Sequence, residues 1–253
     1  MNLTDVRRAT RRALVRPVLV LLDLVLPPRC PGCRSIVATD RSFCLACWNA
    51  LVFITAPLCA CCGAPFVHDR GPGAQCGQCL AAPPRFTAAR AALVYDGPAR
   101  EVLLGFKHAD RQHLAHVMAP HLVRAAAAHL RPGALLVPVP LHWTRLWRRG
   151  FNQAALLAQA VGRLAAVDVA VDALIRVKAT RLSKGLGRKA RADNVRGAFR
   201  VRRREAVSGR DIVLVDDVLT TGATADACAR HLRRAGARSV TVLTWARVVR
   251  DIG

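Results

Sequence analysis

The stretch DIVLVDDVLTTGAT, residues 211–224, carries the clearest structural signal in the chain. Its apolar run, Ile212–Val215, has the length and continuity of a central strand of a parallel sheet, which is buried on both faces. Two adjacent acids, Asp216 and Asp217, follow at the carboxyl end of this strand. Ligands of open α/β sheets bind beyond that edge. The stretch therefore predicts two carboxylates that face a ligand.

The residues after the acids predict a phosphate-binding loop. Gly222 lets the backbone approach a ligand closely, and the amides at the start of the following helix point toward an anion. The acids should then face another part of the same ligand, either hydroxyl groups or a bound magnesium ion. A sugar phosphate satisfies both requirements. The predicted phosphate ligands are Thr220, Thr221, Gly222, Ala223 and Thr224.

The rest of the chain from Ala91 onward alternates apolar runs of strand length with helical patterns. This rhythm predicts an α/β fold, with a parallel sheet covered by helices on both faces. Asn152 is the expected N-cap of one helix, and Gly236 is the expected C-cap of another. We expect strands at 91–96, 134–140, 211–217 and 239–248, and helices at 97–108, 113–130, 152–166 and 223–236.

The segment 27–82 precedes this domain and contains four Cys-x-x-Cys pairs. Such spacing lets two thiolates reach one zinc ion from a tight turn, and metal-held thiolates are typical of a reducing cytosol. We therefore predict a small zinc-ribbon module, single or double, and a cytoplasmic protein. Pairing of neighbouring motifs would give two closed structural sites, interleaved pairing is an alternative, and a single zinc ion is a third arrangement. The predicted ligands are Cys30, Cys33, Cys44, Cys47, Cys59, Cys62, Cys76 and Cys79.

Residues 1–26 form the third expected region, an amphipathic N-terminal helix. Their basic start and short apolar stretch, 17–26, resemble a signal peptide, but Asp23 interrupts the stretch and no small-residue cleavage site follows. The stretch is also shorter than the roughly 20 residues of a membrane span. We expect the helix to pack on its own protein and no segment to span a membrane, with loose membrane association as the alternative.

The formal net charge of the chain is +23, from 39 Lys and Arg against 16 acids. Such a balance favours a polyanionic partner, although an arginine-rich composition also follows from a high-GC genome. The segment 181–210 is the most basic, with eleven Lys and Arg and two acids. It is either a solvated loop or a flap that closes over a phosphorylated substrate or follows a nucleic-acid backbone. The candidate nucleic-acid contacts are Arg188, Lys189, Arg191 and Arg196.

Several motifs in one order resemble the ComF family of competence-associated proteins, and the resemblance covers roughly residues 25–247. The cysteine pairs are followed by VPVPLHWTRLWRRGFNQA (137–154), NVRGAF (194–199) and VLVDDVLTTGAT (213–224). The resemblance implies a zinc ribbon followed by a type I phosphoribosyltransferase-like domain, placed here at 90–250. Its signature implies that Asp216 and Asp217 hold the ribose hydroxyls of phosphoribosyl diphosphate (PRPP) with magnesium, and that Thr220–Thr224 hold the 5′-phosphate.

A basic loop before the helix at residue 152 is the expected pyrophosphate site. It contains Arg145, Arg148 and Arg149, and Gly150 permits a tight turn. The family binds pyrophosphate at the corresponding loop, and Arg149 is suited to grip a diphosphate. Lys107 falls where the family usually has a lysine after its first helix, so it is assigned to the same group.

Two functions follow from these features. The preferred hypothesis is a PRPP-binding protein that acts in DNA uptake with single-stranded DNA, with a competence helicase or processing proteins as further partners. The alternative is an active phosphoribosyltransferase that transfers ribose 5-phosphate to an unidentified acceptor. Aromatic residues are only 5% of the chain, and we expect Trp48, Trp143 and Trp147 in the core rather than stacked on bases.

Overall fold

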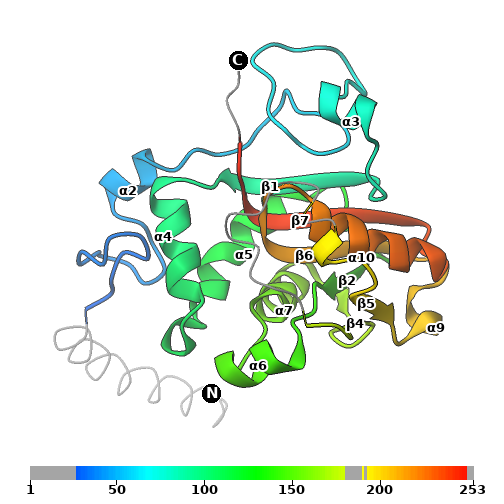
Figure 1. The fold of residues 1–253 in the computed structure, drawn as a ribbon. Helices are drawn as coiled ribbons and strands as arrows, with labels where there is room; N and C mark the ends of the chain where they lie inside the picture. Colours follow the sequence, from blue (N-terminus) through cyan, green and yellow to red (C-terminus); the bar gives the residue numbers. More distant parts are fainter. Residues whose placement is uncertain (1–26, 180–189, 191–192, 250–253) are drawn as a thin grey trace, which may run out of the picture.

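The computed structural model describes residues 27–179, 190 and 193–249 (Figure 1). The expected helix at 1–26 lies outside the described residues, and so do three candidate nucleic-acid contacts, Arg188, Lys189 and Arg191. In the described part of the chain, no helix combines the length and apolar character needed to cross a bilayer.

A parallel sheet of five strands forms the centre of the molecule (Figure 1). Neighbouring strands are parallel throughout, as the alternation of apolar runs and helices predicts. Successive residues of β6 point to opposite faces, and Ile212 and Val213 belong to different buried clusters. The apolar run is continuous because both faces are covered. The strands in spatial order are β1 (Ala88–Val94), β7 (Ser239–Arg247), β6 (Asp211–Leu219), β2 (Leu135–Pro138) and β3 (Asp168–Val169).

Helices cover both faces of the sheet, as predicted (Figure 1). One face carries α4 (Gly97–Phe106), α5 (Leu114–Ala125) and α7 (Gln153–Ala165). The other face carries α10 (Ala223–Arg234), against which a small β-hairpin packs. The hairpin strands are β4 (Leu174–Arg176) and β5 (Phe199–Val201), and the short helices are α2 (Leu45–Asn49), α3 (Gly77–Ala81), η1 (Ala109–Arg111), α6 (Trp143–Arg149) and α9 (Arg204–Val207).

The ends of several elements differ from the sequence-based prediction. The side chain of Asn152 accepts a hydrogen bond from the amide of Ala154 at 3.1 Å, which confirms it as the N-cap of α7. The C-cap of α10 is Ala235, and Gly236 follows it with a φ of +98° that favours glycine. The helix expected at 113–130 ends at Ala125.

The cysteine-rich segment covers the outer edge of β1, which would otherwise present unpaired backbone groups. Val52 accepts a hydrogen bond from the amide of Val94 at 2.9 Å, and the amide of Ile54 donates to Ala92 at 3.1 Å. Farther along, the amide of Ala89 donates to the carbonyl of Cys61 at 2.6 Å. The module is therefore bonded to the sheet along the length of this edge strand.

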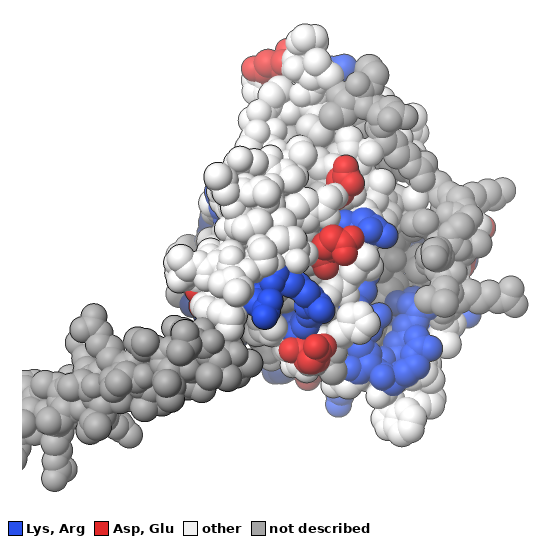
Figure 2. All heavy atoms as spheres, turned by 90° about the vertical axis from the view of Figure 1, so that its left-hand side faces the viewer, with Lys and Arg blue, Asp and Glu red and all other residues white. Residues whose placement is uncertain are grey.

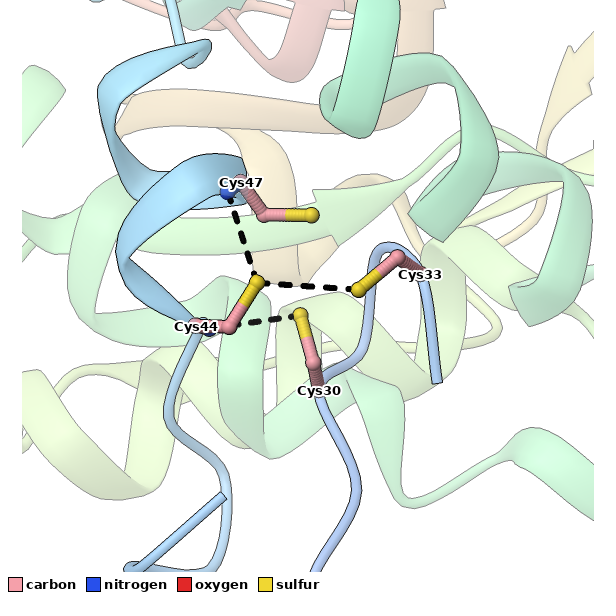
Figure 3. A group of neighbouring side chains, drawn as sticks. All are labelled: Cys30, Cys33, Cys44 and Cys47. Atoms are coloured by element: carbon pink, nitrogen blue, oxygen red, sulfur yellow. Dashed lines mark hydrogen bonds between the residues drawn. The ribbon is translucent and has the colours of Figure 1, made fainter. Parts of the chain in front are cut away.

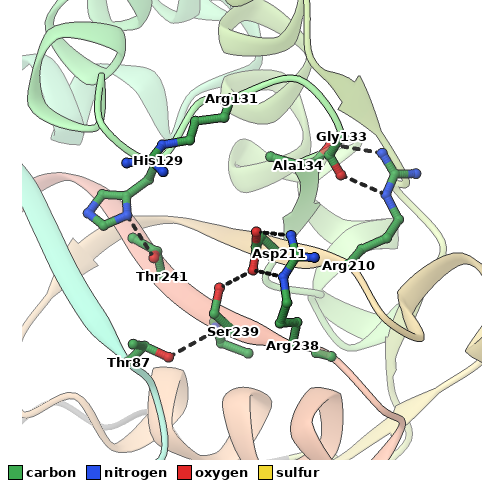
Figure 4. A network of polar contacts seen from close by, with 12 residues as sticks. Thr87, His129, Arg131, Gly133, Ala134, Arg210, Asp211, Arg238, Ser239 and Thr241 are labelled. Atoms are coloured by element: carbon green, nitrogen blue, oxygen red, sulfur yellow. Dashed lines mark hydrogen bonds and ion pairs between the residues drawn. The ribbon is translucent and has the colours of Figure 1, made fainter.

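The amino-terminal edge of the sheet is held by a polar network (Figure 4). The carboxylate of Asp211, the first residue of β6, accepts hydrogen bonds from Ser239 at 2.7 Å and from Arg238 Nε at 2.9 Å. The guanidinium of Arg210 donates to the carbonyls of Gly133 at 3.0 Å and Ala134 at 2.9 Å. These contacts join the starts of three strands, so they fix the register of the sheet at the edge opposite the acid pair.

Candidate functional site

A cavity of about 380 Å³ opens where β6 passes into α10. It brings together both acids, the threonine–glycine loop and Lys107, which were predicted from the sequence to bind one ligand. Two strands contribute to it, since Val242 and Thr244 of β7 line its wall beside β6. The lining residues are Lys107, Arg145, Asp216, Asp217, Val218, Leu219, Thr220, Thr221, Gly222, Ala223, Thr224, Ala225, Val242 and Thr244.

The two acids lie inside β6, which continues to Leu219, rather than at its end. Asp216 Oδ1 accepts a hydrogen bond from the amide of Asp217 at 2.9 Å, and Asp217 Oδ2 lies 3.4 Å from Lys107 Nζ. Burial and, to a smaller extent, the charge of Asp217 raise the pKa of Asp216, and the amide of Asp217 and the charge of Lys107 oppose this rise, so that the pKa lies at about 8. Asp216 is thus the acid of the pair that holds a proton more readily, and Asp217 is paired with a lysine.

The loop Thr220–Thr224 has the backbone arrangement of an anion site. Gly222 is the N-cap of α10 with a left-handed φ of +78°, which L side chains rarely adopt. Within the described residues, no acceptor is found for the amides of Thr221, Gly222 and Thr224. The amides of a helix start that lack acceptors attract negative charge. The loop can therefore receive a phosphate without breaking existing bonds.

The basic segment before α7 is a helix, α6, and not the loop that we expected. His142 caps its start by accepting from the amide of Thr144, and Gly150 ends it with a φ of +80°. Arg145 lines the cavity. Arg149 donates to Gln153 Oε1 at 2.8 Å, and although burial lowers the pKa of Arg149, the charge of Asp217 raises it. Arg149 therefore lies within electrostatic reach of the acid pair, but Arg145 is the arginine at the cavity wall.

Two residues of the site were not predicted. Thr244 is paired in register with Asp216, is fully buried, and has a hydroxyl with no hydrogen-bond partner among the described residues. Arg176 of β4 lowers the pKa of Asp216 through its charge. A threonine within an apolar strand and an arginine in a short hairpin carry no sequence signal for a ligand site.

Arg196, the one described member of the predicted nucleic-acid contacts, lies elsewhere. It forms an ion pair with Asp193 at 3.0 Å and is exposed. It lines a separate cavity of about 110 Å³ beside α10, together with Arg230 and His231.

The cysteines form two clusters of four, and in each the sulfur atoms lie within 4.8 Å of one another. In the first cluster the four side chains converge on one point (Figure 3), and the sulfurs of Cys33 and Cys44 are 3.6 Å apart. In the second, the sulfurs of Cys62 and Cys76 are 3.7 Å apart. A tetrahedral zinc–sulfur site with bonds of about 2.3 Å places its sulfurs about 3.8 Å apart. The clusters are Cys30, Cys33, Cys44 and Cys47, and Cys59, Cys62, Cys76 and Cys79.

This grouping shows that neighbouring motifs pair and that the interleaved arrangement was not adopted. Hydrogen bonding to Ser35 lowers the pKa of Cys33 to about 6, whereas burial raises the pKa of Cys47 in the same cluster. The donor set of four thiolates suits structural zinc, because it fills the tetrahedral shell and leaves no position for a substrate. Cys61 stays outside both clusters, and Cys228 is buried in α10.

Comparisons with known proteins agree with both parts of this architecture. Residues 21–80 match the double zinc ribbon domain, and residues 148–249 match the phosphoribosyl transferase domain. The fold and the sites thus define a class of protein in which a double zinc ribbon precedes a phosphoribosyltransferase-type domain. A solved phosphoribosylpyrophosphate synthetase from Mycobacterium smegmatis is 14% identical with a TM-score of 0.35, covering 61% of this chain and 46% of that one.

Three similar proteins specify the family. The chain is 33% identical over 232 residues to DNA utilization protein YhgH of Escherichia coli (strain K12), covering 89% of this chain and 100% of the relative. It is 30% identical over 230 residues to competence protein F of Haemophilus influenzae, covering 87% of this chain and 96% of the relative. It is 29% identical over 221 residues to competence protein ComFC of Bacillus subtilis, covering 84% of this chain and 87% of the relative. The chain belongs to the ComF family.

Proposed function

We propose that the 380 Å³ cavity binds PRPP together with magnesium. The observation that carries the proposal is the shared cavity itself: the acid pair and the threonine–glycine loop line one space. A ligand that fills it must carry a phosphate for the loop and hydroxyl groups or a cation for the carboxylates. PRPP offers all three when it is bound with magnesium.

Each part of the site has a separate role in this proposal. The amides of Thr221, Gly222 and Thr224 hold the 5′-phosphate. Asp216 and Asp217 accept hydrogen bonds from the ribose hydroxyls. They are also hard oxygen donors of the kind that hold magnesium, which would neutralise the diphosphate. Lys107, Arg145 and Arg149 supply positive charge for the diphosphate.

Calorimetric titration with PRPP and magnesium tests the assignment. The wild-type chain should bind, and the double variant Asp216→Asn with Asp217→Asn should lose binding because it keeps the shape of the site but not its charge. Glu101→Gln is the control, since Glu101 is an exposed acid of α4 outside the cavity lining. Equal affinity of the wild type and the double variant would contradict the proposal.

We further infer that the protein acts on single-stranded DNA during DNA uptake. Its relatives are named for DNA utilization and competence, and the chain has a net charge of +23. Charge-driven binding to single strands weakens with salt, with a slope of about −0.7 per phosphate contacted. A salt titration with a labelled oligothymidylate should show such a slope. The absence of any affinity at low salt would contradict the inference.

Phosphoribosyl transfer is the second candidate, and the cations around the cavity favour it. In this reaction an acceptor forms a bond with the anomeric carbon while the bond to diphosphate breaks, and Lys107, Arg145 and Arg149 stabilise the departing charge. The measurement is release of pyrophosphate from PRPP in the presence of candidate nucleobases. If PRPP binds but pyrophosphate is not released with any of the acceptors, phosphoribosyl transfer is contradicted and PRPP binding is the function.

A further inference from the structure

Helix α6 (Trp143–Arg149) faces the protein with its basic side and presents its apolar side to solvent. Trp143, Leu146 and Trp147 are exposed to 68%, 42% and 87%. Arg145 and Arg149, about half a turn away on the helix, are less exposed, and Arg145 lines the cavity. An ordinary surface helix has the reverse arrangement. We expected these two tryptophans and Trp48 in the core, and the structure shows that this prediction was wrong, since Trp48 is also exposed, to 46%.

The two indole rings lie on one side of the helix, because residues four apart are neighbours on its surface. No residue of α6 is buried, so this apolar side adds nothing to the core. Large exposed aromatic side chains are enriched where one protein surface meets a partner. The side is therefore available to a partner outside the described fold.

The charge around the rings identifies the occupant. Helix α6 contains three arginines and no acid, and Arg148 is exposed between the ring side and the cavity side. Figure 2, drawn from the left-hand side of Figure 1, shows several Lys and Arg side chains, with an acidic group beside them, at about the height at which α6 lies in Figure 1. Aromatic rings flanked by cations are the elements of a site for single-stranded nucleic acid, because bases stack on the rings and phosphates pair with the cations.

We propose that Trp143 and Trp147 form a stacking platform for the bases of single-stranded DNA, and that Arg148 contacts its backbone. The proposal rests on the inferred DNA-binding function and assigns it a place. Because the opposite side of the same helix borders the proposed PRPP cavity, a bound strand lies about one helix diameter, roughly 10 Å, from that cavity. Nucleic acid and PRPP would thus bind on opposite sides of the same helix, α6.

Fluorescence anisotropy with a labelled oligothymidylate tests the platform. The double variant Trp143→Ala with Trp147→Ala should bind at least tenfold more weakly, with an unchanged salt slope because the rings carry no charge. Arg148→Ala should instead reduce the slope by about 0.7, the value for one lost phosphate contact. Trp147→Phe, which keeps a ring, should retain most of the affinity. Leu164→Ala is the matched control, since Leu164 is an exposed apolar residue of another helix.

The outcomes separate this proposal from the proposed function. Unchanged affinity of the double tryptophan variant, in a chain that binds the oligonucleotide, overturns the platform alone. Failure of the wild-type chain to bind overturns both the platform and the DNA-binding function. A wild-type dimer that the double variant converts to a monomer, measured by light scattering, would assign the ring side to self-association and overturn the platform. Calorimetry with PRPP on the same variant reports whether the cavity is intact.

Discussion

Asp216 occupies a position where its carboxyl group is poorly hydrated and adjoins a second acid. Its pKa is raised from 3.8 to about 8, mainly by burial. The folded protein therefore binds a proton that the unfolded chain releases, and this contribution to stability is complete below about pH 4 and is lost as the pH rises through 8. Carboxyl groups whose pKa is raised in this way cluster at functional sites.

The variant Asp216→Asn should remove this pH dependence. Relative to the variant, the wild-type chain should lose free energy of unfolding as the pH rises from 4 to 8, by at most about 1.4 kcal/mol per pH unit. Above pH 8 the difference should stay constant. Urea unfolding of both chains at a series of pH values measures it, and parallel pH profiles would show that Asp216 is ionised in the folded state.

Thr244 gives a second prediction at the residue scale. Its buried hydroxyl has no partner among the described residues, and leaving such a group unpaired costs about 1–3 kcal/mol. Thr244→Val should stabilise the ligand-free chain by about 1 kcal/mol and weaken PRPP binding several-fold if the hydroxyl bonds to the ligand. Thermal unfolding and calorimetry measure the two effects. A destabilised variant would show that the hydroxyl already has a partner.

The sequence predicted the cavity residues that belong to one contiguous motif. Asp216, Asp217 and the threonine–glycine loop were found because a strand, two acids and a loop follow one another in 14 residues. Thr244 and Arg176 come from other strands and reach the site only through the fold. Nothing in the sequence around either residue marks it as part of a ligand site. The lack of a hydrogen-bond partner for the Thr244 hydroxyl is a property of packing and not of the sequence.

At the scale of elements, α6 shows what periodicity can and cannot predict. The spacing of Trp143, Leu146 and Trp147 is helical, but the segment is short and rich in arginine, and we assigned it to a loop. Even a correct helix assignment would have placed the rings inward. The pattern identifies which residues share a side, whereas the direction of that side depends on what the neighbouring elements leave uncovered.

The start of β6 gives a second prediction at the scale of elements. The pKa of Asp211 is lowered to about 2 by hydrogen bonding to Arg238 and then to Ser239. Its stabilising contribution is present above its ordinary pKa of 3.8 and is lost as the pH falls through 2. Asp211→Asn should be less stable than the wild-type chain at neutral pH, and the difference should shrink in acid. Because these groups are partly exposed, added salt should also reduce it.

At the scale of the whole molecule, the zinc ribbon and the sheet form one structure. A Cβ atom at Gly63 would lie 2.2 Å from the carbonyl oxygen of Ala89 in β1, so only glycine allows the ribbon to approach this closely. The side chain of Arg247, at the end of β7, also donates to the carbonyl of Cys62 at 2.5 Å. The sequence predicted two separate regions, and it had no signal for their contact because the contact is made mostly by backbone atoms.

Gly63→Ala should therefore destabilise the entire protein. Both a backbone clash and a φ of +66° oppose the substitution, and together they should cost about 3 kcal/mol or more. Gly71→Ala is the control, because Gly71 has a similar φ of +82° but open space around it, and should cost only about 1–2 kcal/mol. Chemical unfolding of the two variants measures both values. Equal losses would show that the ribbon can shift away from β1.

Removal of zinc should destabilise the entire protein, as Gly63→Ala should. Chelation would release the eight thiolates, and the ribbon would then lose the restraint that holds Cys61 and Val52 against β1. The thermal unfolding of the sheet, followed by near-ultraviolet circular dichroism of the buried Trp245, should shift to lower temperature. An unchanged transition for the sheet would show that the two parts are stable independently.

The covered edge of β1 has a consequence during translation. β1 leaves the ribosome directly after the ribbon, whereas its partner in the sheet, β7, is made only after all the other described strands. At about 5–20 residues per second, β1 waits roughly 7–30 seconds for β7. In the final structure β1 lies between the ribbon and β7. Throughout that interval, only the ribbon of these two neighbours has been synthesised. A nascent chain that acquires its metal early is thereby protected from pairing this strand with other chains on the same polysome.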